Sequence, residues 1–161
     1  MLVVAMLRTL ATVYKLGWEV EFAGINVADA AAGALGDITV SEANQQIVMA
    51  LEVTERPVEA SRVQSTFRTK IATSGIVDYL FLVDIRRVGA EAMEESRKYF
   101  AQGYEVNFVD IETWLVTCLA TLGAKGRSTY SAYLTELFGA LELPKTVKAG
   151  WNEEVFKLTG A

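Results

Sequence analysis

The chain has 161 residues, 52% of them hydrophobic, and a formal net charge of −5. This length fits one domain with a sizeable core. Because the sequence holds no histidine and one cysteine, it excludes Ser-His-Asp triads, Cys-His dyads, histidine-ligated zinc and an intrachain disulfide. The lone thiol suits a reducing cytoplasm, and the acidic balance argues against a broad nucleic-acid-binding surface but not against a local basic patch.

Periodicity along the chain predicts alternating helices and strands. Apolar residues recur at helical spacing in some segments and at every second position in others, and the 78–84 segment is apolar on both faces, which is typical of a central strand. In chain order we expect helix 2–16, strand 18–22, loop 28–36, strands 37–40 and 47–54, helix 58–73, strand 78–84, helix 90–103, strand 104–110, and helices 111–122, 129–141 and 151–158. The segment 123–133, with two glycines, Lys125 and Arg127 before a helix, could contact a phosphate, but an exposed loop between helices is the commoner reading and the one we expect.

The order of these elements predicts an α/β fold with a mixed sheet. Three consecutive strands indicate an antiparallel meander, and the later strands, each reached through a helix, indicate parallel crossovers. Helices are therefore expected on both faces of the sheet. The apolar segment 2–16 is too short to span a bilayer and has no signal-peptide cleavage pattern, so we expect a buried helix and no membrane segment.

Glu52 interrupts the apolar run of the 47–54 strand, where an unpaired buried charge is costly. A two-residue hairpin turn places Asp37 opposite Ala50 and diagonal to Glu52, whereas a four-residue turn places Asp37 directly opposite Glu52. Both registers put Asp37, Glu52 and Thr54 on one face. Because adjacent carboxylates repel each other, we expect a divalent cation, Mg²⁺, to bind between them.

The same glutamate has a simpler explanation, which is the commoner one for a strand glutamate. It faces solvent, or it pairs with Arg56, Arg62 or Arg68 nearby. The following helix carries polar and cationic groups that could face a phosphate, and an ordinary solvated helix face is the alternative reading. These helix residues are Arg62, Gln64, Arg68 and Lys70.

The stretch GDI…ALEVTERP on a hairpin, followed by a helix and a hydrophobic strand, resembles the PD-(D/E)xK nuclease superfamily, and most of all SacI-type type II restriction endonucleases. The order helix, three strands, helix, strand matches the core of that superfamily. The resemblance implies a single restriction-endonuclease-like domain over residues 1–161, with the core at about 1–84 and a helical C-terminal extension at about 110–161.

The resemblance also implies roles for individual residues. Asp37 and Glu52 match the two metal-binding acids, with Mg²⁺, or Mn²⁺ in its place, as the cofactor. The lysine of the motif falls on Thr54, which supplies no cation, so Lys70 or Arg56 would have to replace it in space. The implied reaction is hydrolysis of a DNA phosphodiester by metal-activated water. The implied DNA-binding residues are Arg56, Arg62, Gln64 and Arg68.

Cutting two strands asks for two active sites, so the resemblance implies a cytoplasmic homodimer that acts on DNA. The chain is short for an enzyme that also reads a base sequence, which points to a recognition part in a missing domain or a partner chain. Two alternatives stay open. One is a catalytically silent nuclease-fold module used for protein interaction or DNA binding, favoured by Thr54 and the high apolar content. The other is an unrelated α/β binding protein.

Overall fold

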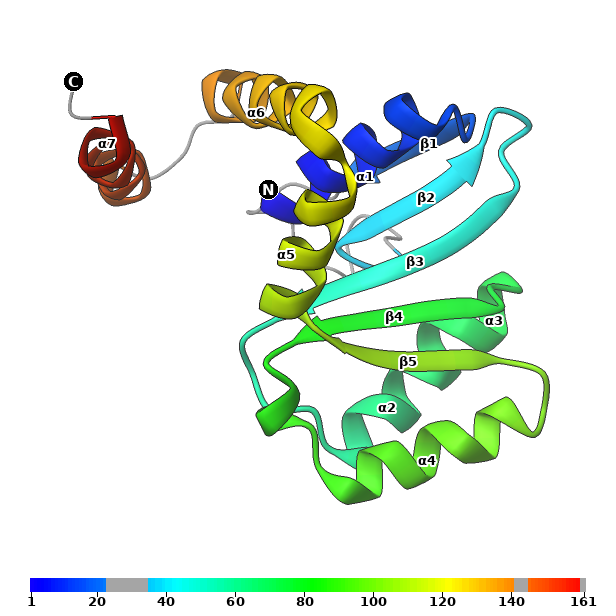
Figure 1. The fold of residues 1–161 in the computed structure, drawn as a ribbon. Helices are drawn as coiled ribbons and strands as arrows, with labels where there is room; N and C mark the ends of the chain where they lie inside the picture. Colours follow the sequence, from blue (N-terminus) through cyan, green and yellow to red (C-terminus); the bar gives the residue numbers. More distant parts are fainter. Residues whose placement is uncertain (23–34, 141–144, 160–161) are drawn as a thin grey trace.

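The computed structural model describes residues 1–22, 35–140 and 145–159 (Figure 1). Within them, five strands form one sheet in the order β1-β2-β3-β4-β5. The first three strands pair antiparallel, and β3, β4 and β5 pair parallel. The mixed sheet, with its meander and its parallel crossovers, is therefore as predicted. The strands are β1 (Trp18–Phe22), β2 (Ile38–Glu42), β3 (Ile47–Thr54), β4 (Asp78–Val83) and β5 (Glu105–Asp110).

The helices agree with the predicted periodicity over most of their length. The predicted 58–73 helix is a succession of α2, η1 and α3, in which η1 is a π-helical turn, and Gly75 ends it with a positive φ of 68°. Most of the predicted 28–36 loop lies outside the described residues. The helical segments are α1 (Leu2–Tyr14), α2 (Ala60–Thr66), η1 (Phe67–Ile71), α3 (Ala72–Ser74), η2 (Ile85–Arg87), α4 (Ala90–Phe100), α5 (Ile111–Thr121), α6 (Gly123–Ala140) and α7 (Lys145–Thr159).

The prediction of an exposed loop at 123–133 is wrong, because this segment forms the first half of α6. Its glycine-rich composition is typical of a loop, but burial at intervals of three or four residues holds it helical: Gly126, Tyr130, Leu134 and Leu137 are buried. A Cβ on Gly126 would lie 2.8 Å from the Leu122 Cβ, so the glycine permits a close approach. Helix α6 lies against α1, as Figure 1 shows.

Two hydrophobic layers cover the two faces of the sheet. On one face, Ile38, Val40 and Leu51 pack with side chains of α1 and α6. On the other face, residues such as Ala50 and Phe81 pack with side chains of α2 and α4. Since strand side chains alternate, Glu52, two positions after Ala50, lies on the α2 face. Among the described residues no helix is both long and apolar enough to cross a membrane.

Candidate functional site

The hairpin register brings the two predicted acids together. Ile38 pairs with Leu51 across β2 and β3, and one position further along this register Asp37 lies opposite Glu52. This is the Asp37–Glu52 pairing expected for a four-residue turn, but the structure reaches it with a tighter turn, in which the Glu42 N–H bonds to the Gln46 carbonyl, and with a bulge between Val40 and Ser41. Opposed residues of antiparallel strands share a face, with Cβ atoms roughly 5 Å apart. The charge of Asp37 also raises the pKa of Tyr79, to a smaller extent than burial and the Glu52 charge do.

Glu52 is 7% exposed, and side chains from two other elements hold its carboxylate. The Arg62 guanidinium on α2 donates a hydrogen bond to Oε1. The Tyr79 hydroxyl on β4 donates to Oε2 at 3.0 Å, and the Lys70 Nζ on η1 lies 3.9 Å from the same oxygen. The pairing with an arginine that the sequence left open is therefore with Arg62. These contacts explain how a carboxylate is accommodated in a buried strand position.

Asp37 is held against the adjacent strand as well. Its Oδ2 accepts the backbone N–H of Val53 at 2.8 Å, which ties the start of β2 to the segment that carries Glu52. The preceding residue, Gly36, lies so close to β3 that an added Cβ would be 2.5 Å from the Leu51 carbonyl oxygen. Glycine at this position therefore lets Asp37 approach Glu52.

The remaining predicted residues divide into those near the acid pair and those away from it. Thr54 follows Glu52 on the same face, and its hydroxyl accepts the backbone N–H of Arg56 at 3.1 Å. The Arg56 side chain is exposed. Gln64 and Arg68 face α4 instead of the acids. The Gln64 side chain hydrogen-bonds to Glu95 on α4. Lys98 lowers the pKa of the Glu95 carboxyl most, and Gln64 lowers it to a smaller extent. Arg68 lies near Tyr99, on the same helix as Glu95. The structure thus brings Arg62 and Lys70 to Glu52, but not Gln64 or Arg68.

Tyr79 is the site residue that sequence reasoning missed. Its ring is fully buried, and burial, followed by the neighbouring Glu52 and Asp37 charges, raises its pKa far above the usual range. The sequence does hold a signal for this residue. Tyr79 lies in a predicted central strand whose other inner residues are Leu, Phe and Val, and a buried tyrosine hydroxyl usually needs a hydrogen-bond partner. Nothing in the sequence names Glu52 as that partner.

The donor set has the chemistry of a magnesium site. Asp37 and Glu52 supply hard carboxylate oxygens, and Mg²⁺ commonly binds one or two protein carboxylates, keeps several waters and meets substrate phosphate. No group of three or more His, Cys, Asp or Glu residues gathers anywhere in the described ranges, so within them Asp37 and Glu52 are the carboxylates that would hold such an ion. Arg62 and Lys70 offset the charges of the two carboxylates, and the Met1 amino group also interacts with Asp37.

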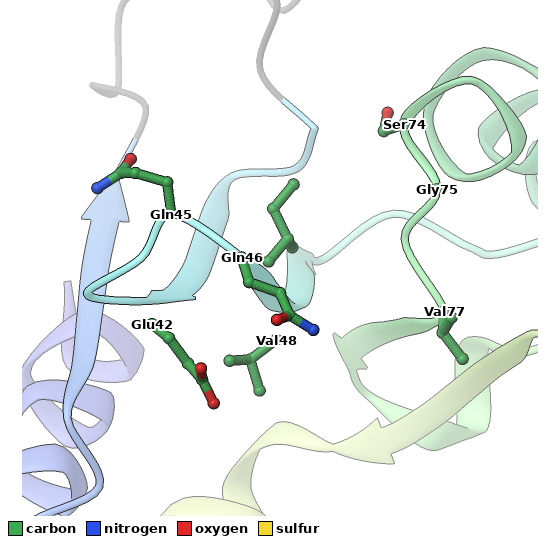
Figure 2. A pocket seen from close by; sticks show the side chains of 8 residues that line it. Glu42, Gln45, Gln46, Val48, Ser74, Gly75 and Val77 are labelled. Atoms are coloured by element: carbon green, nitrogen blue, oxygen red, sulfur yellow. The ribbon is translucent and has the colours of Figure 1, made fainter.

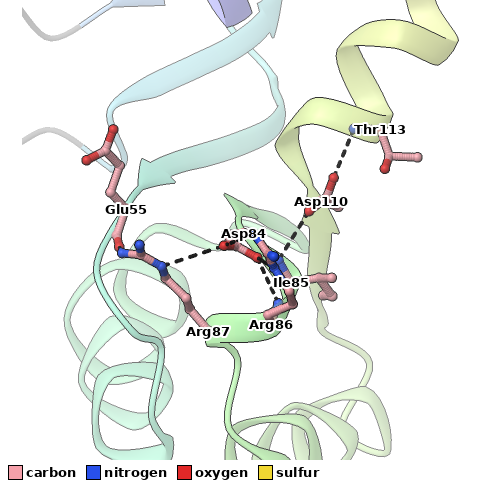
Figure 3. A network of polar contacts seen from close by, with 7 residues as sticks. All are labelled: Glu55, Asp84, Ile85, Arg86, Arg87, Asp110 and Thr113. Atoms are coloured by element: carbon pink, nitrogen blue, oxygen red, sulfur yellow. Dashed lines mark hydrogen bonds and ion pairs between the residues drawn. The ribbon is translucent and has the colours of Figure 1, made fainter.

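A second polar network joins the carboxyl ends of the parallel strands (Figure 3). Asp84, directly after β4, accepts two hydrogen bonds from the Arg86 side chain, each 2.9 Å long. These bonds lower the pKa of the Asp84 carboxyl, and the Arg87 side chain also forms an ion pair with it. Asp110 begins α5 by accepting the Thr113 N–H at 2.9 Å and also accepts the Ile85 N–H at 3.3 Å. Asp84 is thus a strand-boundary residue, and the network connects β4 to β5.

A cavity of about 570 Å³ lies at the other end of β3, between the hairpin turn and the end of α3 (Figure 2). Gln45, Gln46, Ser74 and Val77 are among the residues that line it. Glu52 is near the carboxyl end of β3, whereas the cavity adjoins the beginning of that strand. The acid pair and this cavity are therefore separate features.

A mixed sheet with helices on both faces and two opposed acids on its central hairpin defines a restriction-endonuclease-like α/β domain. Comparison with protein families agrees: the family model of the SacI restriction endonuclease C-terminal domain matches residues 1–84. This match covers more than half of the chain, so the chain belongs to that family, and the predicted SacI-type relationship is confirmed. The matched residues include Asp37, Glu52 and Lys70. No curated protein matches the chain.

Proposed function

We propose that this chain is the catalytic part of a magnesium-dependent DNA endonuclease of type II restriction character. The observation that supports the proposal most is the meeting of Asp37, Glu52 and Lys70 on one face of the sheet, within the segment that matches a restriction-endonuclease domain. DNA enters the proposal through the family, because a restriction endonuclease cleaves DNA.

In the proposed site, Asp37 and Glu52 bind the metal ion. When bound, the ion lowers the pKa of a water and stabilises the charge on the leaving oxygen. The residues themselves fix the position of the site: Asp37 is held by the Val53 N–H, and Glu52 by the hydroxyl of Tyr79. Glu52 lies on β3, and Asp37 directly precedes β2 and is tied to β3 by its hydrogen bond to Val53, so paired strands fix both acids for in-line attack.

Lys70 takes the role that Thr54 leaves open. The Thr54 hydroxyl has no charge and already bonds to the backbone of the turn after β3. The Lys70 ammonium instead reaches Glu52 from η1, at 3.9 Å from Oε2. In the proposed reaction this ammonium stabilises negative charge on the phosphate and helps to orient the attacking water. The π-helical turn that carries it is of a kind often found at functional sites.

A catalytically silent nuclease-fold module is the second candidate, and one observation favours it. Both oxygens of Glu52 already have partners, and Arg62 and Lys70 balance the two acids without a metal ion. A family member that had lost its chemistry would retain such a neutral, closed group of side chains. The lack of a lysine at Thr54 points the same way.

Cleavage of supercoiled plasmid DNA separates the two candidates. We expect the wild-type chain to nick the plasmid with Mg²⁺ or Mn²⁺, and Glu52→Gln to be inactive. Lys70→Met should lose about 10²-fold or more, the usual cost of removing one charge-stabilising group. Arg68→Gln is the matched control. It removes a positive charge from η1, the same helical turn that carries Lys70, but at a residue that lies near Tyr99 on α4.

The outcomes of this experiment have separate meanings. No nicking by the wild type, together with no heat of Mg²⁺ or Mn²⁺ binding in calorimetry, would leave the silent module as the better explanation. Metal binding without cleavage would show that Lys70 does not replace the lysine of the motif. Equal losses in Lys70→Met and Arg68→Gln would show that Lys70 acts only through the overall charge.

A further inference from the structure

We infer that Arg62 and the metal ion compete for Glu52, so that Arg62 sets the metal affinity of the site and is released toward the substrate when the metal binds. The inference rests on the proposed function, because it needs a metal ion at the acid pair. Nothing in the matched family description assigns a role to this arginine.

The two firm contacts of Glu52 differ in their freedom to leave. Tyr79 is fully buried between strands, and its hydroxyl is held on Oε2. The Arg62 side chain on Oε1 is 30% exposed and lies on α2, at the edge of the site. A guanidinium on a flexible, partly solvated side chain can turn outward, whereas the Tyr79 ring cannot move without opening the core. Oε1 is therefore the oxygen that becomes available.

Charge explains why both cations cannot stay. With Arg62 in place, the side chains of the two acids, Arg62 and Lys70 sum to zero, and the Met1 amino group interacts with Asp37 as well. A divalent cation would therefore enter a site without net negative charge, beside a guanidinium on the same oxygen. Like charges at this separation repel strongly where solvent screening is reduced. If Arg62 leaves, the acids and Lys70 sum to −1, and a divalent cation then makes the site +1. A positive site suits an incoming phosphate.

The released guanidinium has a natural second partner. Planar guanidinium groups bind phosphate oxygens in a bidentate manner, and Arg62 lies on the first turn of a helix that faces the acid pair. A phosphate held near the metal is within the range of a side chain that already reaches Glu52. Arg62 thus exchanges one anion for another, and it is a substrate-positioning residue in addition to the counterion of Glu52.

The test is the affinity for Mn²⁺ without DNA, measured by calorimetry on wild-type protein, Arg62→Gln and Arg68→Gln. We expect Arg62→Gln to bind Mn²⁺ about tenfold tighter than wild type, the equivalent of about 1.4 kcal/mol. Arg68→Gln removes the same charge from a residue near Tyr99, so it should change the affinity by less than about twofold. An ordinary structural ion pair predicts the opposite order, because losing Arg62 would then only disturb Glu52.

If wild type binds Mn²⁺ and Arg62→Gln binds it no tighter than Arg68→Gln, the inference is wrong while the proposed function stands. If neither wild type nor either variant binds Mn²⁺, and wild type does not nick plasmid DNA, the proposed function fails and the inference fails with it. Circular dichroism of each variant verifies folding.

A second measurement applies should Arg62→Gln not fold. Mg²⁺ is titrated into wild-type protein and into Glu52→Gln while the Arg62 side-chain N–H signal is followed by NMR. We expect the signal to shift in the wild type as its partner changes, and not to respond in Glu52→Gln. A wild-type signal that stays constant while Mg²⁺ saturates the site would overturn the inference.

Discussion

Replacing Tyr79 by Phe removes one hydroxyl from a fully buried ring and leaves the ring packing against Phe81, whose centroid is 5.3 Å away. The lost group is the donor to Glu52 Oε2 at 3.0 Å. Stability therefore reports directly whether this hydrogen bond holds the buried carboxylate.

The magnitude follows from the partners that remain. A hydrogen bond to a charged group contributes about 1.5–3 kcal/mol. Glu52 keeps Arg62 on Oε1 and Lys70 at 3.9 Å from Oε2, so its carboxylate is not left without partners. We therefore expect the lower part of this range, about 1.5–2 kcal/mol. For a chain of this size, each kcal/mol lowers Tm by about 2–4 °C, so Tm should fall by about 3–8 °C.

Urea unfolding followed by circular dichroism measures the change, with Tyr99→Phe as the matched control. The Tyr99 hydroxyl also donates to a glutamate, Glu95, at 3.0 Å, but Lys98 binds that carboxylate at 2.6 Å and the pair lies on one helix. Tyr99→Phe should therefore lower the free energy of unfolding by less than Tyr79→Phe does. A Tyr79→Phe protein within about 0.5 kcal/mol of wild type, or one no less stable than Tyr99→Phe, would refute the reasoning.

Substitutions at three further positions test other parts of the structure by thermal unfolding. Gly36→Ala should destabilise the fold by about 1–3 kcal/mol, because its Cβ would meet the Leu51 carbonyl oxygen at 2.5 Å; an unchanged Tm would contradict this close approach. Asp78→Asn should raise stability at pH 7 and have little effect near pH 3. Burial, and then the facing charge of Glu105, raises the pKa of Asp78 in the folded state, so wild type loses stability as pH rises through that pKa; an equal effect at both pH values would refute this. Asp110→Ala should lower Tm by removing the N-cap of α5, whereas Asp110→Asn, which still caps, should have little effect.

The strand and helix pattern was accessible from the sequence because it depends on local periodicity. Trp18, Val20 and Phe22 alternate with glutamates, and they form β1 with the same alternation of burial. The loop prediction at 123–133 failed for a physical reason: Gly126 weakens helix propensity locally, but the burial of Tyr130 and Leu134 in the core beside α1, which holds the segment helical, is a property of the folded chain.

The candidate site was accessible only in part. The alternation of side chains along a strand placed Asp37 and Glu52 on one face under either turn, so their proximity did not depend on the register. Which arginine reached Glu52 did depend on how the α2–α3 segment crosses the sheet, and three arginines were equally plausible from sequence distance. That Arg68 lies near Tyr99 on α4 follows from its position on the helix once the helix is docked.

By itself, the amino-acid sequence determined the class of fold, the family and the pair of acids, because hydrophobic periodicity and the spacing of a hairpin act over a few neighbouring residues. Only the tertiary structure decided how the Glu52 charge is satisfied. Its partners come from 10, 18 and 27 residues further along the chain, at Arg62, Lys70 and Tyr79. Such contacts form when separate elements pack against the same face of the sheet, and the local spacing of residues in the sequence does not determine that packing.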